Sequence, residues 1–219
     1  MNGKKIYPSK SIRYLGIHID ETLNFSHNSK ILTKKLKRAN GILSKARHFI
    51  DTDQLKTLYY AVFSSHLTYA CQIWGQSQNT HNHRIFTLQN TALRIMTFSN
   101  SRTSSNPLYA KLKILKLKDI IILKNCLFVY DSLNKMTPLC FHDYFQQLQS
   151  VHSIQTKSAS LGCVYVTTSN TKRYGLNSIT KKSAADWNTI LKTIRINLFS
   201  LPRQKLKTII SLYFLQSYQ

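Results

Sequence analysis

The strongest constraint on the fold is one apolar stripe that begins soon after residue 26. Its members recur at alternating spacings of four and three residues: Leu32, Leu36, Ala39, Leu43, Ala46 and Ile50. This spacing places apolar side chains on one side of an α-helix and predicts a helix of about six turns. The basic residues of the same segment fall largely off the stripe. The helix is therefore expected to pack by one side and to present cations on the other.

The same segment holds the densest run of positive charge in the chain. Between Glu21 and Asp51 there is no acid, and the cations are Lys30, Lys34, Lys35, Lys37, Arg38, Lys45 and Arg47. The whole chain has 31 Lys and Arg against 8 Asp and Glu in 219 residues, a formal net charge of +23. Residues 1–110 and 111–219 are similarly basic, so the charge does not belong to a tail. The balance favours a polyanionic partner and leaves few carboxylates for acid–base or metal chemistry.

The start of the chain is expected to form a β-hairpin. Residues 5–7 and 12–19 have strand-like composition, and residues 8–11 are typical of a turn. Gly16 lies inside the second predicted strand, where it indicates a bulge or a close backbone approach. The sequence therefore places the hairpin turn at 8–11 and Gly16 within a strand.

Two more helices are expected before a polar segment. Asp51 followed by Gln54 resembles the capping box that begins a helix. The apolar face of that helix is expected to be Leu55, Leu58, Tyr59, Val62, Phe63 and His66. A third helix is expected over 83–98, with Ile85, Leu88, Ala92 and Ile95 inward and Arg84 and Arg94 outward. The polar segment 99–106 then separates two lobes.

The second lobe is also expected to be mainly helical. A largely buried helix that ends before Pro138 has an apolar face of Leu117, Ile120, Ile121, Leu123, Leu127 and Phe128. We expect a short strand at 161–168, a loop at 170–180, a helix at 183–194 and a basic amphipathic helix after Pro202. The predicted fold class is thus mainly α: an N-terminal β-hairpin, a helical bundle and a second helical lobe with a small β element.

Candidate metal sites have structural explanations. Cys71, Cys126, Cys140 and Cys163 never form C-x-x-C, and their spacing of 55, 14 and 23 positions is typical of ordinary, partly buried thiols. His81 and His83 have no local Cys or carboxylate and are expected in a polar loop before the third helix. Asp51 and Asp53 are explained by capping and the helix dipole. No cofactor is expected in this chain.

Other functional classes find little support. Ser65 and His66 are adjacent and would point to different helix faces, so they do not make a nucleophile–base pair. No apolar run reaches the ~18 residues of a membrane span, and no apolar segment follows the N-terminal lysines. We therefore expect an intracellular protein, nuclear or cytoplasmic, that is neither membrane-bound nor secreted.

Several local strings, in order, resemble one known family. They are Tyr14-Leu15-Gly16 with Asp20, Leu23-Asn24-Phe25-Ser26-His27, Ser65-His66-Leu67-Thr68-Tyr69-Ala70 with Trp74-Gly75, Gln89-Asn90-Thr91-Ala92-Leu93-Arg94-Ile95, Pro107-Leu108-Tyr109 and Trp187-Asn188. Together they resemble the region after the catalytic palm in reverse transcriptases of non-LTR retrotransposons, especially jockey-like elements. The resemblance covers nearly the whole chain.

The resemblance implies three regions: a primer-grip-like hairpin over 1–23, a thumb-like helical bundle over 24–98 and a post-thumb lobe over 99–219. In the hairpin, Tyr14, Leu15 and Gly16 would hold the primer 3′ end; the alternative is an edge strand whose Tyr14 and Leu15 serve packing. The thumb would contact template–primer phosphates through cations, here Lys30, Lys34, Lys35, Lys37, Arg38, Lys45, Arg47, Arg84 and Arg94.

The resemblance also implies what this chain lacks. Reverse transcriptases hold two Mg²⁺ through palm aspartates, and this sequence has no Asp-Asp pair. We therefore expect a C-terminal fragment that binds an RNA–DNA or duplex backbone without sequence specificity and without polymerisation. Its fingers and palm, and the Mg²⁺, would belong to the intact parent. The alternative is a domesticated module that binds a protein partner.

Overall fold

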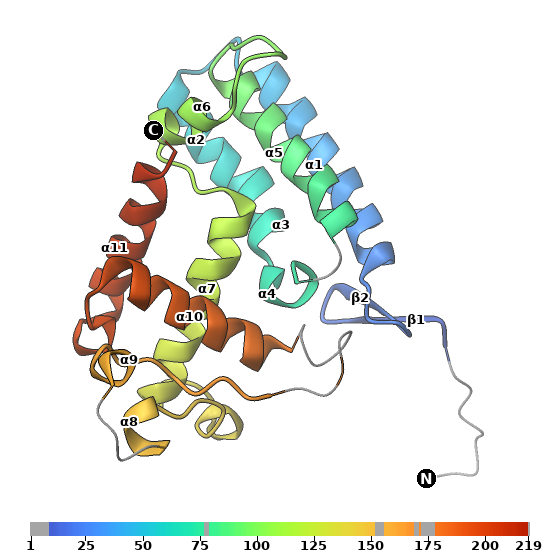
Figure 1. Ribbon diagram of the computed structural model, residues 1–219. Helices are drawn as coiled ribbons and strands as arrows, with labels where there is room; N and C mark the ends of the chain where they lie inside the picture. The colour runs from blue at the N-terminus through green and yellow to red at the C-terminus, as the bar shows by residue number, and fades with distance from the viewer. Residues whose placement is uncertain (1–8, 77–78, 152–155, 169–170, 172–177, 219) are drawn as a thin grey trace. The chain divides into compact units, whose positions relative to one another are not determined.

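The computed structural model describes residues 9–76, 79–151, 156–168, 171 and 178–218 (Figure 1). The chain forms two compact units, residues 1–103 and 104–219, and the division falls inside the polar segment 99–106. Helices dominate both units, and the sheet found among the described residues is a two-stranded hairpin. The predicted fold class, mainly α with an N-terminal β-hairpin, is confirmed.

The hairpin turn lies later in the chain than the sequence predicted. Strands β1 (Ser11–Tyr14) and β2 (Ile17–Asp20) pair antiparallel, with Tyr14 opposite Ile17. Leu15 and Gly16 form the turn with φ values of 44° and 81°. A two-residue turn with both φ positive matches the twist of the strands, and glycine adopts it without steric cost. The hairpin turn therefore lies at 15–16 and not at the predicted position, Ser11 belongs to β1, and the predicted strand position of Gly16 was wrong; residues 5–8 lie outside the described residues.

Helix α1 (Ser26–Ala46) carries the stripe that the sequence predicted. Leu32, Leu36, Ala39 and Leu43 are buried, while Ile50 lies beyond the helix end. The Asp20 carboxylate, at the end of β2, accepts hydrogen bonds from the backbone N–H groups of Asn24 at 2.8 Å and Ser26 at 3.1 Å. Asp20 thus joins the hairpin to the first turn of α1 and satisfies a backbone donor at the helix start.

The next helical segment begins at the predicted cap. Helix α2 (Thr52–Leu58) follows Asp51, whose side chain accepts a hydrogen bond from the Gln54 N–H at 2.8 Å. It continues into a π-helical turn, η1 (Tyr59–Ser64), and α3 (Ser65–Thr68). The buried apolar residues are Leu55, Tyr59, Phe63 and Leu67, whereas the predicted His66 is exposed. A π turn holds more residues than an α turn, so the buried face keeps a spacing of four and reaches Leu67.

Helix α5 (Asn79–Met96) packs along α1 and completes the core of the first unit (Figure 1). It follows the short α4 (Cys71–Trp74) and begins earlier than predicted, so positions 81–83 are helical rather than a loop. Asn40 on α1 donates to the Leu88 carbonyl at 3.0 Å. Gln89 is buried and donates to the Tyr59 hydroxyl at 3.2 Å, while burial raises the pKa of that hydroxyl. These polar contacts fix the register between helices.

The second unit is built around α7 (Leu117–Leu133), which packs against α10 (Ile179–Ile194) and α11 (Arg203–Gln216). The remaining described elements are α6 (Asn106–Leu112), η2 (Leu139–Phe141), α8 (Leu148–Val151), α9 (Lys157–Ser160) and η3 (Leu198–Ser200). The predicted face of α7 is largely buried, as expected. Most of the predicted loop at 170–180 lies outside the described residues.

The strand predicted at 161–168 is wrong. Within the described part of the second unit, only an isolated bridge pairs Val164 with Gln147. Gly162 has a φ of 79°, a left-handed conformation that interrupts an extended run. The Asn188 side chain then takes both backbone groups of Val164, accepting from its N–H and donating to its carbonyl, each at 2.8 Å. A side chain from α10 therefore replaces a partner strand.

Candidate nucleic-acid interface

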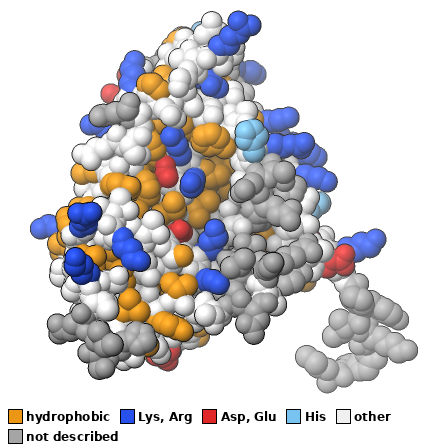
Figure 2. Space-filling model, viewed as in Figure 1, with side chains coloured by type: hydrophobic (Ala, Val, Ile, Leu, Met, Phe, Trp, Pro, Cys, Tyr) orange, Lys and Arg blue, Asp and Glu red, His pale blue; other side chains and the backbone are white. Residues whose placement is uncertain are grey.

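One side of α1 is a continuous basic surface. We call this surface the cationic face; it comprises Lys30, Lys34, Lys37, Arg38 and Lys45, all of them exposed. Successive residues of an α-helix are about 100° apart, so these positions fall opposite the buried stripe. Helix α1 contains no acid. Figure 2 shows Lys and Arg side chains gathered along the outer side of this helix.

No ion pair with an acidic side chain of the described residues neutralises the cationic face. Among the residues that the structure describes, the ion pair found is between Arg203 and Asp131, in the second unit. The Asp20 carboxylate, at the end of β2, is occupied by the backbone N–H groups at the helix start. Like charges three and four residues apart on a helix repel each other. A polyanion placed along α1 would relieve this repulsion.

The structure separates three predicted cations from this face. Lys35 lines a different pocket, between α1 and the hairpin turn. The Arg47 guanidinium lies over the Phe98 ring, 4.9 Å from its centroid. Arg94 is half-buried, and its Nε donates to the Thr103 carbonyl at 3.0 Å. Arg47 and Arg94 thus have structural contacts within the first unit.

The tip of the hairpin is apolar and open to solvent. The exposed fractions of Tyr14 and Leu15 are 62% and 71%, so these side chains do not serve packing within the first unit. The backbone of the turn is nevertheless held, because the Tyr69 hydroxyl donates to the Leu15 carbonyl at 2.5 Å. The His18 N–H also donates to the Asn28 side chain at 3.3 Å. A fixed backbone therefore presents two free side chains.

Behind the hairpin turn lies a pocket of about 240 Å³. Its walls come from the turn, β2, α1, α3 with the residue after it, and α4: Gly16, Ile17, Asn28, Ile31, Leu32, Lys35, Ser65, His66, Tyr69 and Trp74. The rings of His18 and His27 meet nearby with centroids 4.7 Å apart. Burial, followed by the charge of His27, lowers the pKa of His18. Lys35 is the lysine that lines this pocket.

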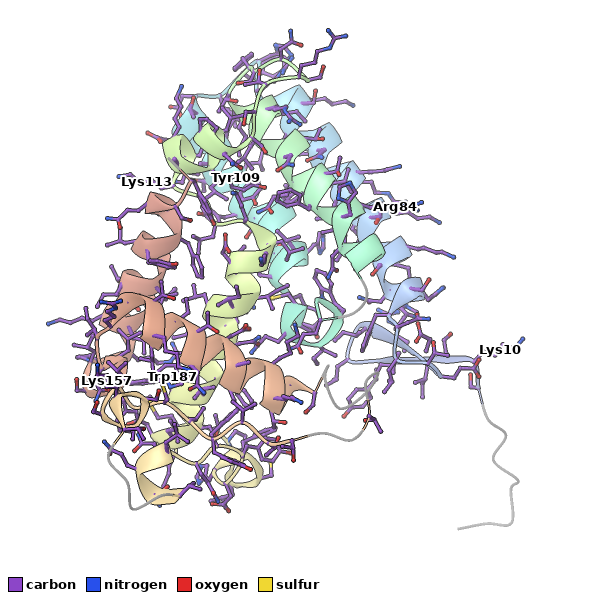
Figure 3. The ribbon with its side chains drawn as sticks, viewed as in Figure 1. Lys10, Arg84, Tyr109, Lys113, Lys157 and Trp187 are labelled. Carbon is purple, nitrogen blue, oxygen red and sulfur yellow. The ribbon has the colours of Figure 1, made fainter. Side chains whose placement is uncertain are left out.

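A second hollow, which we call the α1–α5 groove, has a volume of about 350 Å³. It is lined by His27, Ser29, Lys30, Ile31, Thr33, Lys34 and Lys37 from α1 and by Arg84 from α5. Figure 3 labels Arg84 on the part of α5 that lies beside α1. The groove brings Arg84 together with lysines about fifty positions earlier in the chain. The sequence alone did not indicate His27, Ser29 and Thr33, although their helical positions beside the lysines could have done so.

Gly41 lies in the middle of the cationic face, and replacing it should stabilise the protein. A Cβ built at Gly41 has no neighbour within 4 Å, and its φ is not left-handed. Gly41→Ala should therefore raise the free energy of unfolding by about 0.5–1 kcal/mol, measured by urea denaturation. Gly162→Ala is the opposite control, because Gly162 has a φ of 79° and a Cβ there would lie 3.1 Å from Asn197 Oδ1. Shifts of equal sign in the two variants would contradict the difference in backbone conformation between these glycines.

The described residues contain no group of three or more His, Cys, Asp or Glu side chains able to hold a metal ion. The four cysteines are free thiols; Cys71, Cys126 and Cys163 are buried and Cys140 is exposed. Burial raises the pKa of the Cys126 thiol, which keeps it protonated. None of the described helices has both the length and the apolar character needed to cross a membrane.

Two curated relatives share sequence with this chain. The probable RNA-directed DNA polymerase from transposon X-element of Drosophila melanogaster is 30% identical over 113 residues, covering 50% of this chain and 12% of that protein. The RNA-directed DNA polymerase from mobile element jockey of Drosophila funebris is 26% identical over 125 residues, covering 55% of this chain and 14% of that protein. No family model matches the chain, and no solved structure matches it significantly.

These matches define the class of protein that the chain is similar to, the RNA-directed DNA polymerases of mobile elements. Within that class, the predicted resemblance to reverse transcriptases of jockey-like non-LTR retrotransposons is confirmed over about half of the chain. The chain spans about an eighth of the length of these relatives.

Proposed function

We propose that this chain binds the backbone of an RNA–DNA or other duplex nucleic acid, without sequence specificity, through the cationic face of α1. The observation that carries the proposal is five exposed cations on one helix side with no ion-pair partner among the described residues. Lys and Arg contacts to phosphates supply affinity and position a protein on a duplex but do not read bases.

The dimensions and residue types of α1 support backbone binding. From Lys30 to Lys45 the helix axis extends over about 22 Å, and a duplex carries one charge per ~1.7 Å of its axis. The face can therefore meet several phosphates at once. Asn and Gln are the side chains that recognise adenine in the major groove. Both asparagines of α1, Asn28 and Asn40, are buried, so the cationic face offers no asparagine that could recognise adenine.

In this proposal the regions take the roles that the family resemblance implies. Residues 1–23 form a primer-grip-like hairpin that offers Tyr14, Leu15 and Gly16, residues 24–98 form the thumb, and residues 99–219 form a post-thumb lobe. Polymerisation by these 219 residues is not proposed, because they contain no adjacent pair of aspartates for two-metal chemistry. A nucleic-acid partner of this kind is met in the nucleus or the cytoplasm.

A second candidate function is a protein-interaction module. Ile12, Tyr14 and Leu15 expose more than half of their surface on the hairpin. Such an apolar tip can contact a protein partner as well as a primer end. Replacing Tyr14 and Leu15 by Ser separates the two functions, because protein binding would be lost while the salt dependence of nucleic-acid binding would be kept.

The test of the proposal is the salt dependence of binding. The full chain should bind an RNA–DNA hybrid and two DNA duplexes of unrelated sequence with similar affinity in fluorescence anisotropy titrations. The slope of log affinity against log salt should be about −4.5, since each of five neutralised phosphates contributes roughly −0.9. A slope near zero, or a strong preference for one sequence, would exclude the proposed function.

A further inference from the structure

We propose that the α1–α5 groove is a phosphate-anchoring site, in which Arg84 from α5 and Lys30, Lys34 and Lys37 from α1 hold phosphate groups of one nucleic-acid strand. This inference rests on the proposed function and adds to it a defined pocket on a second helix. The groove would fix the strand between α1 and α5, whereas the cationic face alone would only attract it.

The charges around the groove converge from two helices. Lys30, Lys34 and Lys37 stand at spacings of four and three on α1, so they form one row about 10 Å long. Arg84 faces this row from α5. No Asp or Glu lines the groove, and none of the four cations belongs to the ion pair found among the described residues. The groove is therefore a hollow of uncompensated positive charge.

The groove also has polar hydroxyl groups. Ser29 lines it, is only 3% exposed, and its Oγ has no hydrogen-bond partner in the structure. A buried hydroxyl without a partner is destabilising, and native proteins rarely leave one unsatisfied. Thr33 lies one turn further along the same wall. Phosphate oxygens accept hydrogen bonds from hydroxyls, so a bound phosphate group would supply the missing partner.

The composition of the groove favours phosphate over a carboxylate. The planar guanidinium of Arg84 can bond two oxygens of one phosphate, while lysines act as point charges around it. Four cations exceed what one carboxylate needs, and they suit successive phosphates of one strand. A volume of about 350 Å³ is within the range of pockets that hold small ligands. An acidic protein segment is the competing occupant, and a glutamate peptide tests for it in the experiment below.

The experiment measures the binding of inorganic tripolyphosphate to the full chain by isothermal titration calorimetry. Arg84→Gln and Lys34→Gln should each weaken binding by about tenfold, because each removes a charge-assisted contact. The matched control, Arg102→Gln on an exposed loop, removes one charge outside both the groove and the cationic face. Its affinity should stay within about twofold of the unmodified chain.

Ser29→Ala distinguishes the contribution of the pocket hydroxyl to binding from that of the cations. It removes the hydroxyl without altering any cation, so it should weaken tripolyphosphate binding about threefold while the melting temperature stays constant or rises.

Equal losses of tripolyphosphate affinity in Arg84→Gln and Arg102→Gln would contradict the assignment of the groove as a phosphate site, even if the chain still bound the duplex with a steep salt slope. Equal competition by a decamer of glutamate would contradict the preference of the groove for phosphate over carboxylate. If tripolyphosphate binding depended on Arg84 but the chain did not bind the duplex, the phosphate site would be supported and the proposed function would be excluded.

Discussion

Replacing Lys34, Lys37 and Arg38 together by Glu is expected to reduce the affinity for an RNA–DNA duplex by about a hundredfold or more at low salt. These residues are exposed, adjacent on the cationic face, and paired with no acid among the described residues. The substitution turns three attractive phosphate contacts into three repulsive ones. The slope of log affinity against log salt should also become shallower by about 3, since each lost contact removes roughly 0.9. Anisotropy titrations at several salt concentrations measure both quantities.

The matched control places the same charge change on the second unit. Lys192, Lys205 and Lys207 are exposed residues of α10 and α11, and replacing all three by Glu changes the net charge equally. This variant should lose only a few-fold in affinity, through the general field of the protein. Equal losses in the two triple variants would show that net charge, and not the face of α1, controls binding. Circular dichroism spectra establish that both variants remain helical.

Local periodicity predicted the helices well because it reports which side of a helix is buried. The stripe from Leu32 to Leu43 and the cap at Asp51 were both found as expected. The shift from His66 to Leu67 was not predictable, because a π turn has no sequence period of its own. The hairpin turn was misplaced because Gly16 fits a bulge and a tight turn equally well from sequence alone.

The candidate site could be predicted only where it lies on a single helix. The cationic face of α1 follows from spacing, because residues three and four apart share a side. The proximity of Arg84 to Lys34 depends on how α5 packs against α1, which periodicity does not specify. For the same reason, the contacts of Arg47 with Phe98 and of Arg94 with Thr103 could not be foreseen.

The Trp187-Asn188 pair shows how a family-like string can have a structural explanation. The sequence placed Trp187 on the short helix predicted at 183–194. In the structure its ring is fully buried on α10 and its Nε1 donates to the Gly162 carbonyl at 3.1 Å (Figure 3). The adjacent Asn188 bonds both backbone groups of Val164. These two side chains hold the irregular segment 162–165 against α10, a role that depends on tertiary packing.

Trp187→Ala should therefore lower the free energy of unfolding of the second unit by about 3–5 kcal/mol, because it leaves a large cavity and an unpaired carbonyl at Gly162. Urea denaturation followed by circular dichroism at 222 nm measures this change. Trp187→Phe keeps most of the ring volume and loses the hydrogen bond, so its loss should be smaller, about 1–2 kcal/mol. A loss below about 1 kcal/mol in Trp187→Ala would contradict the buried position. The cationic face belongs to the first unit, so the duplex affinity of Trp187→Ala, measured well below the unfolding transition, should stay within about twofold of that of the unmodified chain.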